Sequence, residues 1–167
     1  MPIISISEYK MELLKDVYKD KKIVSALDSQ QLDYVPDEPD SLIYLNLFPY
    51  LRIPETQNKA DTYVLISVDI DKISRSNQTY AMYTTTFWIL THKERMKLAG
   101  FNATRIDYIS EEVKKLFDGV QKFGFSEFEL ISNREIILNE KYTYRELTFT
   151  CYDLRHAVTA LGRDNSG

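Results

Sequence analysis

The chain has 167 residues, 44% of them hydrophobic and 28% charged, which is the ordinary composition of one folded domain. Its 25 acidic residues outnumber its 21 basic residues, and the net charge of −4 disfavours a protein that binds nucleic acid through bulk charge. One cysteine excludes an internal disulfide framework, and two histidines that lie far apart argue against a cysteine- or histidine-based metal site.

The first predicted element is a helix that begins after Ser5. Ser5 and Glu8 have the spacing of a capping box, in which each side chain accepts a hydrogen bond from the other residue's backbone N–H. Apolar residues then recur at helical intervals as far as residue 19. A short second helical piece is expected at residues 22–27.

Residues 28–61 form an unusual segment, which we call the arm. The arm contains four of the five prolines, which block long helices and central strands, yet nine large apolar residues lie between Leu42 and Ile53. Such a segment must be buried, either on its own domain or on a neighbouring subunit. The twelve tyrosines of the chain fit both alternatives, because tyrosine suits strands and also suits surfaces that a complex buries. We predict a contact between subunits through five residues of the arm: Leu47, Phe48, Tyr50, Leu51 and Ile53.

Residues 62–74 and 79–92 predict an antiparallel hairpin. In the first stretch apolar and polar side chains alternate, the second is rich in threonine and aromatic residues, and a polar turn separates them. Asp69 and Asp71 fall on the less apolar face of the first strand. We therefore expect both carboxylates to point away from the helices.

A second clear helix is predicted after Thr104. Its apolar residues have helical spacing, and Gly119 provides a suitable C-terminal stop. Residues 125–132 and 142–154 alternate again, which predicts either a hairpin with a long tip or a hairpin with an extra short strand at residues 136–138.

This order of elements predicts an α+β fold, in which an antiparallel sheet of about four strands, formed by two hairpins, packs against two helices. One domain, residues 1–154, includes the arm, and residues 155–167 form a C-terminal tail. Glu127 and Glu129 of the second hairpin are expected to point away from the helices, as Asp69 and Asp71 do.

The sequence offers little for catalysis. Asp69 and Asp71 lack a third metal ligand at any known spacing, and alternating acids are common on solvated strands. His92 is interpreted as the polar end of a strand, and Cys151 as a small buried hydrophobic residue. Phosphate-binding glycine motifs and an apolar run of the about 20 residues that a membrane span needs are both absent from the sequence. We expect no enzyme, no cofactor, no metal and no membrane partner.

The layout of helix, arm, hairpin, helix and hairpin resembles that of the tail terminator proteins of long-tailed bacteriophages, also called tail completion or tail-to-head joining proteins. The resemblance covers roughly residues 5–154. It is carried by four stretches: LFPYLRIP at 47–54, TYVLISV at 62–68, ATRIDYI at 103–109 and YRELTF at 144–149. The arm is longer than expected for the smallest members of that family.

The resemblance implies a structural virion protein of the phage neck, assembled in the bacterial host cytoplasm. Such a protein forms a ring, expected to be a hexamer, that caps the tail tube, and it joins the tail to the head connector or head-closure protein. DNA would pass through the ring without specific binding, and the acidic side chains of Asp69, Asp71, Glu127 and Glu129 are expected to face this channel. Two other hypotheses stay open: another neck or head-completion protein, and a small enzyme or regulatory binding module.

Overall fold

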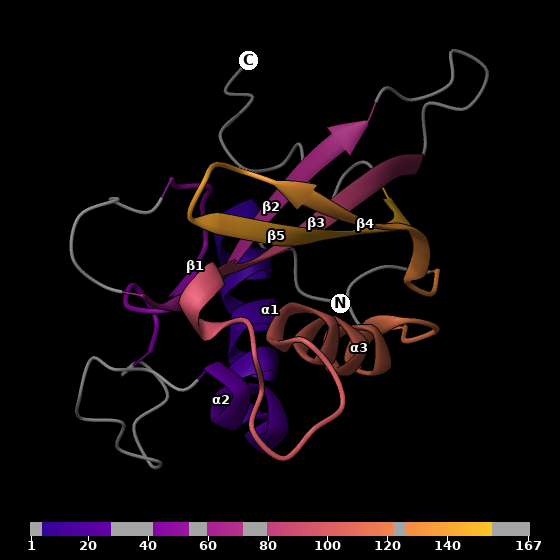
Figure 1. Ribbon diagram of the computed structural model, residues 1–167. Coiled ribbons are helices and arrows are strands. Elements are labelled where there is room, and N and C mark those ends of the chain that lie inside the picture. Colours follow the sequence, from indigo (N-terminus) through magenta and orange to yellow (C-terminus); the bar gives the residue numbers. More distant parts are fainter. Residues whose placement is uncertain (1–4, 28–41, 54–59, 72–79, 122–125, 155–167) are drawn as a thin grey trace.

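A computed structural model describes residues 5–27, 42–53, 60–71, 80–121 and 126–154 (Figure 1). In these ranges the chain forms three α-helices and one five-stranded sheet. The α+β class predicted from the sequence is confirmed. Residues 28–41 and 54–59 of the arm and the predicted C-terminal tail lie outside the described residues.

The helices begin where the sequence places their caps. In α1 (Ile6–Lys19) the Ser5 hydroxyl accepts a hydrogen bond from the Glu8 backbone N–H at 3.0 Å, and the Ser5 N–H donates to the Glu8 carboxylate at 2.6 Å. The capping box is therefore complete. The short helix α2 (Lys21–Leu27) follows directly, and α3 (Arg105–Phe117) begins after Thr104, whose hydroxyl accepts from Asp107 N–H at 3.3 Å.

The sheet has the strand order β1-β2-β3-β5-β4. In chain order the strands are β1 (Leu47–Phe48), β2 (Thr62–Asp71), β3 (Tyr80–His92), β4 (Glu129–Ile137) and β5 (Tyr142–Leu154). The pairs β2–β3, β3–β5 and β5–β4 are antiparallel, and β1 pairs with β2 in parallel. A bulge at Ile131 shifts the register of β4 against β5. The sequence predicted both hairpins, but it did not predict β1 or the continuous length of β4.

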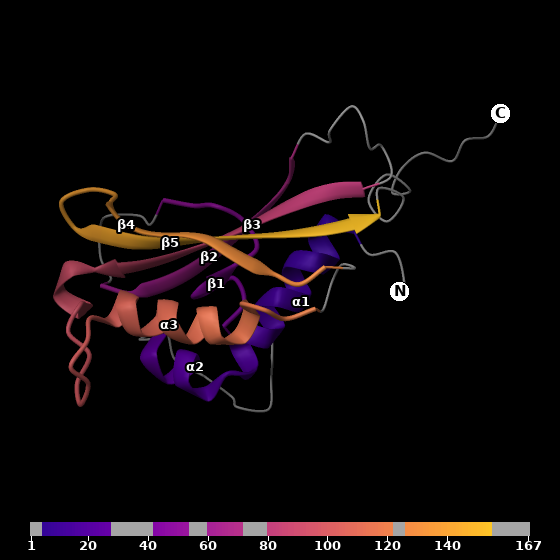
Figure 2. The same cartoon turned by 90° about the vertical axis from the view of Figure 1, so that its right-hand side faces the viewer.

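All three helices cover one face of the sheet, as the side view in Figure 2 shows. The main hydrophobic core fills the space between them, where the ring of Phe87 stacks on that of Phe117 at 5.1 Å and meets Phe149 edge-on. Arg105 ties α2 to this layer, because its guanidinium donates to the carbonyls of Ala26 and Arg95. The opposite face of the sheet, which we call the helix-free face, has a smaller apolar cluster built around Phe48.

Candidate functional site

The helix-free face is partly covered by residues 49–53, which follow β1 and which we call the strap. Three strap side chains are exposed despite being large and apolar: Tyr50 is 46% exposed, Leu51 53% and Ile53 70%. The preceding residues, Leu47 and Phe48, are buried at 0% and 1% because β1 pairs with the first part of β2. The arm is thus divided into a buried strand and an exposed strap.

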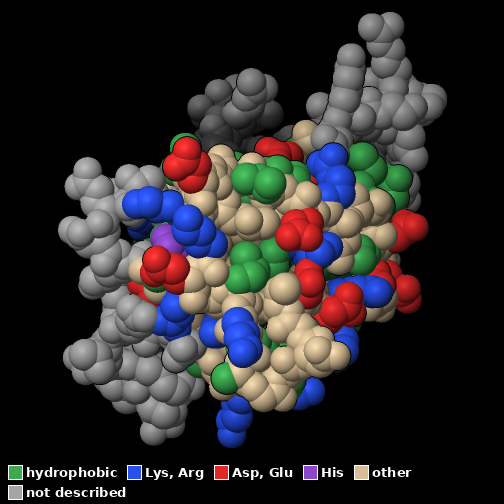
Figure 3. All heavy atoms as spheres, in the orientation of Figure 1, with side chains coloured by type: hydrophobic (Ala, Val, Ile, Leu, Met, Phe, Trp, Pro, Cys, Tyr) green, Lys and Arg blue, Asp and Glu red, His purple; other side chains and the backbone are tan. Residues whose placement is uncertain are grey.

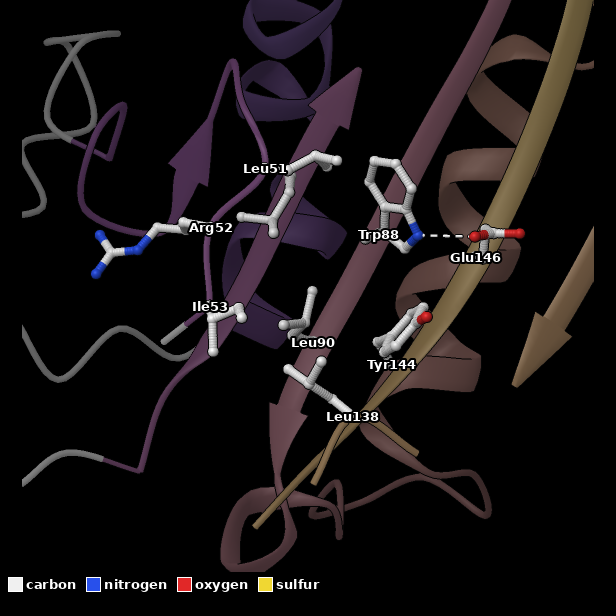
Figure 4. Close-up of a pocket in the computed structure, with 9 residues that line it drawn as sticks. Leu51, Arg52, Ile53, Trp88, Leu90, Leu138, Tyr144 and Glu146 are labelled. Atoms are coloured by element: carbon white, nitrogen blue, oxygen red, sulfur yellow. Dashed lines mark hydrogen bonds between the residues drawn. The ribbon is translucent and has the colours of Figure 1, made fainter. Parts of the chain in front are cut away.

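A groove lies between the strap and the strands β3 and β5, with a cavity volume of about 340 Å³. Its lining is mainly apolar: Leu51, Arg52, Ile53, Leu65, Trp88, Leu90, Leu138, Tyr144 and Glu146. Figure 4 shows Leu51 and Ile53 directed toward the sheet, whereas the guanidinium of Arg52 points away from the groove. Exposed apolar side chains that gather at one place on the surface are typical of a site that binds another protein chain or a ligand.

The floor of the groove ends in a polar pair. The indole Nε1–H of Trp88 donates to the Glu146 carboxylate at 2.9 Å, as the dashed line in Figure 4 marks. Arg134, on β4, donates to the other oxygen of the same carboxylate. These bonds satisfy a carboxylate that would be costly to enclose alone, and they fix the orientation of the indole ring.

Aromatic contacts anchor the strap to the end of the sheet. The guanidinium of Arg52 lies 4.5 Å from the centre of the Phe48 ring and 5.9 Å from that of Tyr63, a cation–π geometry. The Tyr63 ring in turn lies 6.4 Å from Tyr142. Burial, and secondarily the negative charge of Asp61, raises the pKa of Tyr63 to about 12. The same two causes raise the pKa of Tyr142.

Tyr44 stands out in the turn before β1. Its backbone has φ of 69°, in the left-handed region that tyrosine rarely adopts, and its side chain is 58% exposed. Its ring lies 6.4 Å from that of Tyr50 on the strap. An exposed tyrosine in a conformation that suits glycine or asparagine extends the aromatic surface of the strap.

The predicted subunit-contact residues therefore fall into two groups. Tyr50, Leu51 and Ile53 lie on the surface, where a neighbouring chain can reach them. Leu47 and Phe48 do not, because they are buried within the chain's own fold. For these two residues the alternative interpretation, that the arm packs on its own domain, describes the structure.

Three of the predicted acidic residues, Asp69, Glu127 and Glu129, lie on or beside the helix-free face. Asp69 is exposed on β2. Its neighbours in the cross-strand register are Thr84 on β3, Thr150 on β5 and Glu129 on β4, so these four residues form one row across the sheet. Three strand spacings separate the two carboxylates by about 14 Å, which is too far for them to share a ligand. Glu127 is exposed just before β4, and the side chain of Asp71 lies outside the described part.

The residues considered for catalysis are not brought together. His92 ends β3 opposite Tyr142, whereas Cys151 lies nine residues further along β5, about 30 Å away. The Nδ1 atom of His92 accepts from the backbone N–H of Glu94 at 3.2 Å, and Cys151 is buried beside the Tyr9 hydroxyl at 3.6 Å. The described residues contain no group of three or more acidic, histidine or cysteine side chains that could hold a metal ion.

Sequence reasoning missed the groove residues of the central strands. Trp88, Tyr144 and Glu146 looked like ordinary strand residues, and Arg134 like part of a turn. The available signal was the cross-strand register, in which Leu65, Trp88, Glu146 and Arg134 stand side by side. Register depends on all four strands and cannot be obtained from any one of them.

The surface carries charges of both signs. On the side seen in Figure 3, acidic and basic side chains are mixed, and hydrophobic side chains form small separate patches among them. Within the described ranges, no helix is long and apolar enough to cross a membrane.

Comparison with known proteins identifies the family. The model of the YomW family matches residues 13–151, which is most of the chain, so the chain belongs to the YomW family. This family is phage-derived, of the type found in Bacillus prophages, and the chain is therefore a phage-related protein. A search of curated proteins found no match.

Proposed function

We propose that this phage-associated protein is a structural subunit of the phage neck, specifically the tail terminator ring that caps the tail tube and joins the tail to the head connector. It would act through protein contacts and not as an enzyme. The observation that carries this proposal is the exposed apolar groove with its strap. A domain with a complete core gains nothing in its own stability from three large exposed apolar side chains in five residues, but a subunit of an assembly does.

The helix-free face supports the proposed passage of DNA. Between the groove and the row of Asp69 and Glu129 lies a row of hydroxyl residues: Ser67, Thr86, Thr148 and Ser132. Thr148 and Ser132 are partly exposed, whereas Thr86 and the Ser67 hydroxyl oxygen are buried. Hydroxyl and carboxylate groups give phosphate no counter-charge, so a channel lined with them would release DNA as readily as it admits it. We propose that the part of this face beyond the groove is turned toward the channel, with Glu127 at its rim.

The proposal is tested by removing the gene from a prophage that carries it and examining the induced particles by electron microscopy. A missing tail terminator should give tails of uncontrolled length together with heads that have no tail. Supplying the wild-type gene from a plasmid should restore joined particles with tails of uniform length.

Other outcomes would identify the alternatives. Heads that lose their DNA beside free tails of normal length would place the protein at the head connector, as a head-completion protein. Normal particles that fail at a later or earlier step of infection would contradict a structural role in the neck and favour an enzyme or regulatory module.

A further inference from the structure

The five-stranded sheet has two unpaired edges, one on each side. Strand β4 is the last strand on one side, with no partner beyond it in the described part of the chain. On the other side β1 pairs only with Val64 and Leu65, so β2 has no strand partner on this edge from Ile66 onward within the described ranges. Unpaired strand edges are ready to pair with another chain unless they are protected.

The geometry of β4 shows which of its backbone groups point outward. The Leu130 N–H is directed out of the sheet, to the Asp118 carboxylate at 3.0 Å. In an antiparallel pair every second residue of a strand directs its backbone N–H and C=O away from the partner strand. After the bulge at Ile131, these outward-facing residues of β4 are Asn133, Glu135 and Ile137. This edge also carries exposed apolar side chains, since Ile131 is 55% and Ile137 77% exposed.

The edge of β2 is complementary. The Val64 N–H points outward, to the Asn46 carbonyl at 2.8 Å, so the same alternation turns the N–H groups of Ile66, Val68 and Ile70 outward. Among the described residues, none donates to or accepts from these outward groups. Ile70 is 42% exposed at the open end of this edge.

We propose that β4 of one subunit pairs with the uncovered part of β2 of the next, so that the sheet continues from copy to copy. The proposal rests on the ring proposed above. A contact between two different edges is heterologous, and it gives a ring when the rotation between neighbours closes, whereas a contact of one edge with itself stops at a dimer. The partner is therefore a second copy of this chain.

Charge and direction both fit this partner. Arg134 of β4 and Asp69 of β2 are exposed on the same, helix-free face, so they can form an ion pair across the junction. Within one subunit β4 runs antiparallel to β2. A rotation that relates neighbouring subunits about an axis parallel to the strands keeps the strand directions, so β4 of one subunit also runs antiparallel to β2 of the next. The Ile137 end of β4 then lies nearest to the neighbour's strap, where Ile53 is exposed.

The test blocks each edge with a proline, which has no N–H to donate. Glu135→Pro removes an outward donor of β4 and leaves the β4–β5 hydrogen bonds in place, and Ile70→Pro does the same on β2. Glu135→Ala and Ile70→Ala are the matched controls, because they keep the backbone donor. In sedimentation velocity experiments on the full chain, we expect the wild type and both alanine variants to form rings and both proline variants to sediment as monomers.

Mixing the two proline variants gives the decisive result. Each retains one intact edge, so the mixture should form a heterodimer and nothing larger, which also demonstrates that both variants are folded. The proposal is overturned if either proline variant forms rings, if the mixture stays monomeric, or if the wild type does not self-associate. If rings persist in the proline variants while the gene deletion still gives tails of uncontrolled length, only the edge pairing fails and the proposed function stands.

Discussion

The fold opposes ionisation of two tyrosine hydroxyl groups, those of Tyr63 and Tyr142. Both belong to the apolar cluster on the helix-free face, and burial is the main cause that raises the pKa of each. For Tyr63 the folded value is about 12, against an ordinary value of 10.0. A raised tyrosine pKa means that the neutral hydroxyl is favoured by folding, and this links stability to pH.

The free energy of unfolding should therefore fall at high pH. The stabilising effect of Tyr63 is fully present below its unfolded pKa of about 10 and is lost as the pH rises through about 12. Urea unfolding followed at pH 8 and at pH 11 measures this loss. Tyr63→Phe should have a smaller loss between the two pH values than the wild type. Tyr9 and Tyr142, whose pKa values are also raised by burial, account for the pH dependence that remains in this variant. An unchanged loss in Tyr63→Phe would contradict the assignment.

Within one short segment, β1 and the strap should differ sharply in their effect on stability. Phe48 is 1% exposed and packs on Tyr63 and Arg52, whereas Leu51, three residues later, is 53% exposed. Phe48→Ala should lower the free energy of unfolding by about 3–5 kcal/mol, the usual cost of truncating a buried phenylalanine. Leu51→Ala should change it by about 0.5 kcal/mol or less, as exposed sites do. Urea titrations of the two variants at pH 7 measure both effects.

The strap should contribute strongly to assembly, although it contributes little to the free energy of unfolding. Leu51→Asp should leave a folded monomer that no longer forms rings. If Leu51→Asp instead lowers stability as much as Phe48→Ala, the strap belongs to the core and not to the surface. If it assembles as the wild type does, the strap is not a subunit contact.

The elements that sequence predicts well are those fixed by neighbouring residues. The Ser5 and Glu8 pair sets the start of α1, and the alternation of β2 sets its two faces, because these signals lie within a few residues of each other. The two-residue strand β1 has no periodicity and exists only because Val64 and Leu65 offer it an edge. Its pairing turned an arm that the sequence left undecided into a buried strand followed by an exposed strap.

At the scale of the whole molecule, the two faces of the sheet have different tasks. The face under α1 and α3 is closed by a complete core, with Phe87 and Phe117 at its centre. The other face keeps the groove, the hydroxyl row and the exposed carboxylates. In the described part of the chain, β4 and the later part of β2 are left unpaired at the two edges of the sheet. The surfaces left incomplete are thus those that a subunit of a ring would complete with its neighbours.

If the protein works only through such contacts, removing its reactive side chains should leave it functional. A quadruple variant with His92→Asn, Cys151→Ser, Asp69→Asn and Asp71→Ala tests this. Asparagine can still accept the Glu94 N–H, and serine can still bond to the Tyr9 hydroxyl, so the two buried sites keep their contacts. Asp69→Asn removes only the exposed ion pair proposed with the neighbour's Arg134, which contributes little because water and salt screen it, and it leaves the backbone pairing of the two edges in place. In a phage carrying the variant gene, we therefore expect tails of normal length and wild-type infectivity.

The matched comparison is the double variant Leu51→Asp and Ile53→Asp, which keeps every reactive group and removes the apolar strap surface. That phage should give tails of uncontrolled length and heads without tails, because the defect is in assembly. Intact but inactive particles from the quadruple variant, with the protein present in the neck, would instead reveal a chemical role for one of the four residues. Restoring His92, Cys151 and the two aspartates separately would then identify it. His92 lies eight residues along β3 from Thr84, the partner of Asp69, and its own partner Tyr142 lies nine residues along β5 from Cys151.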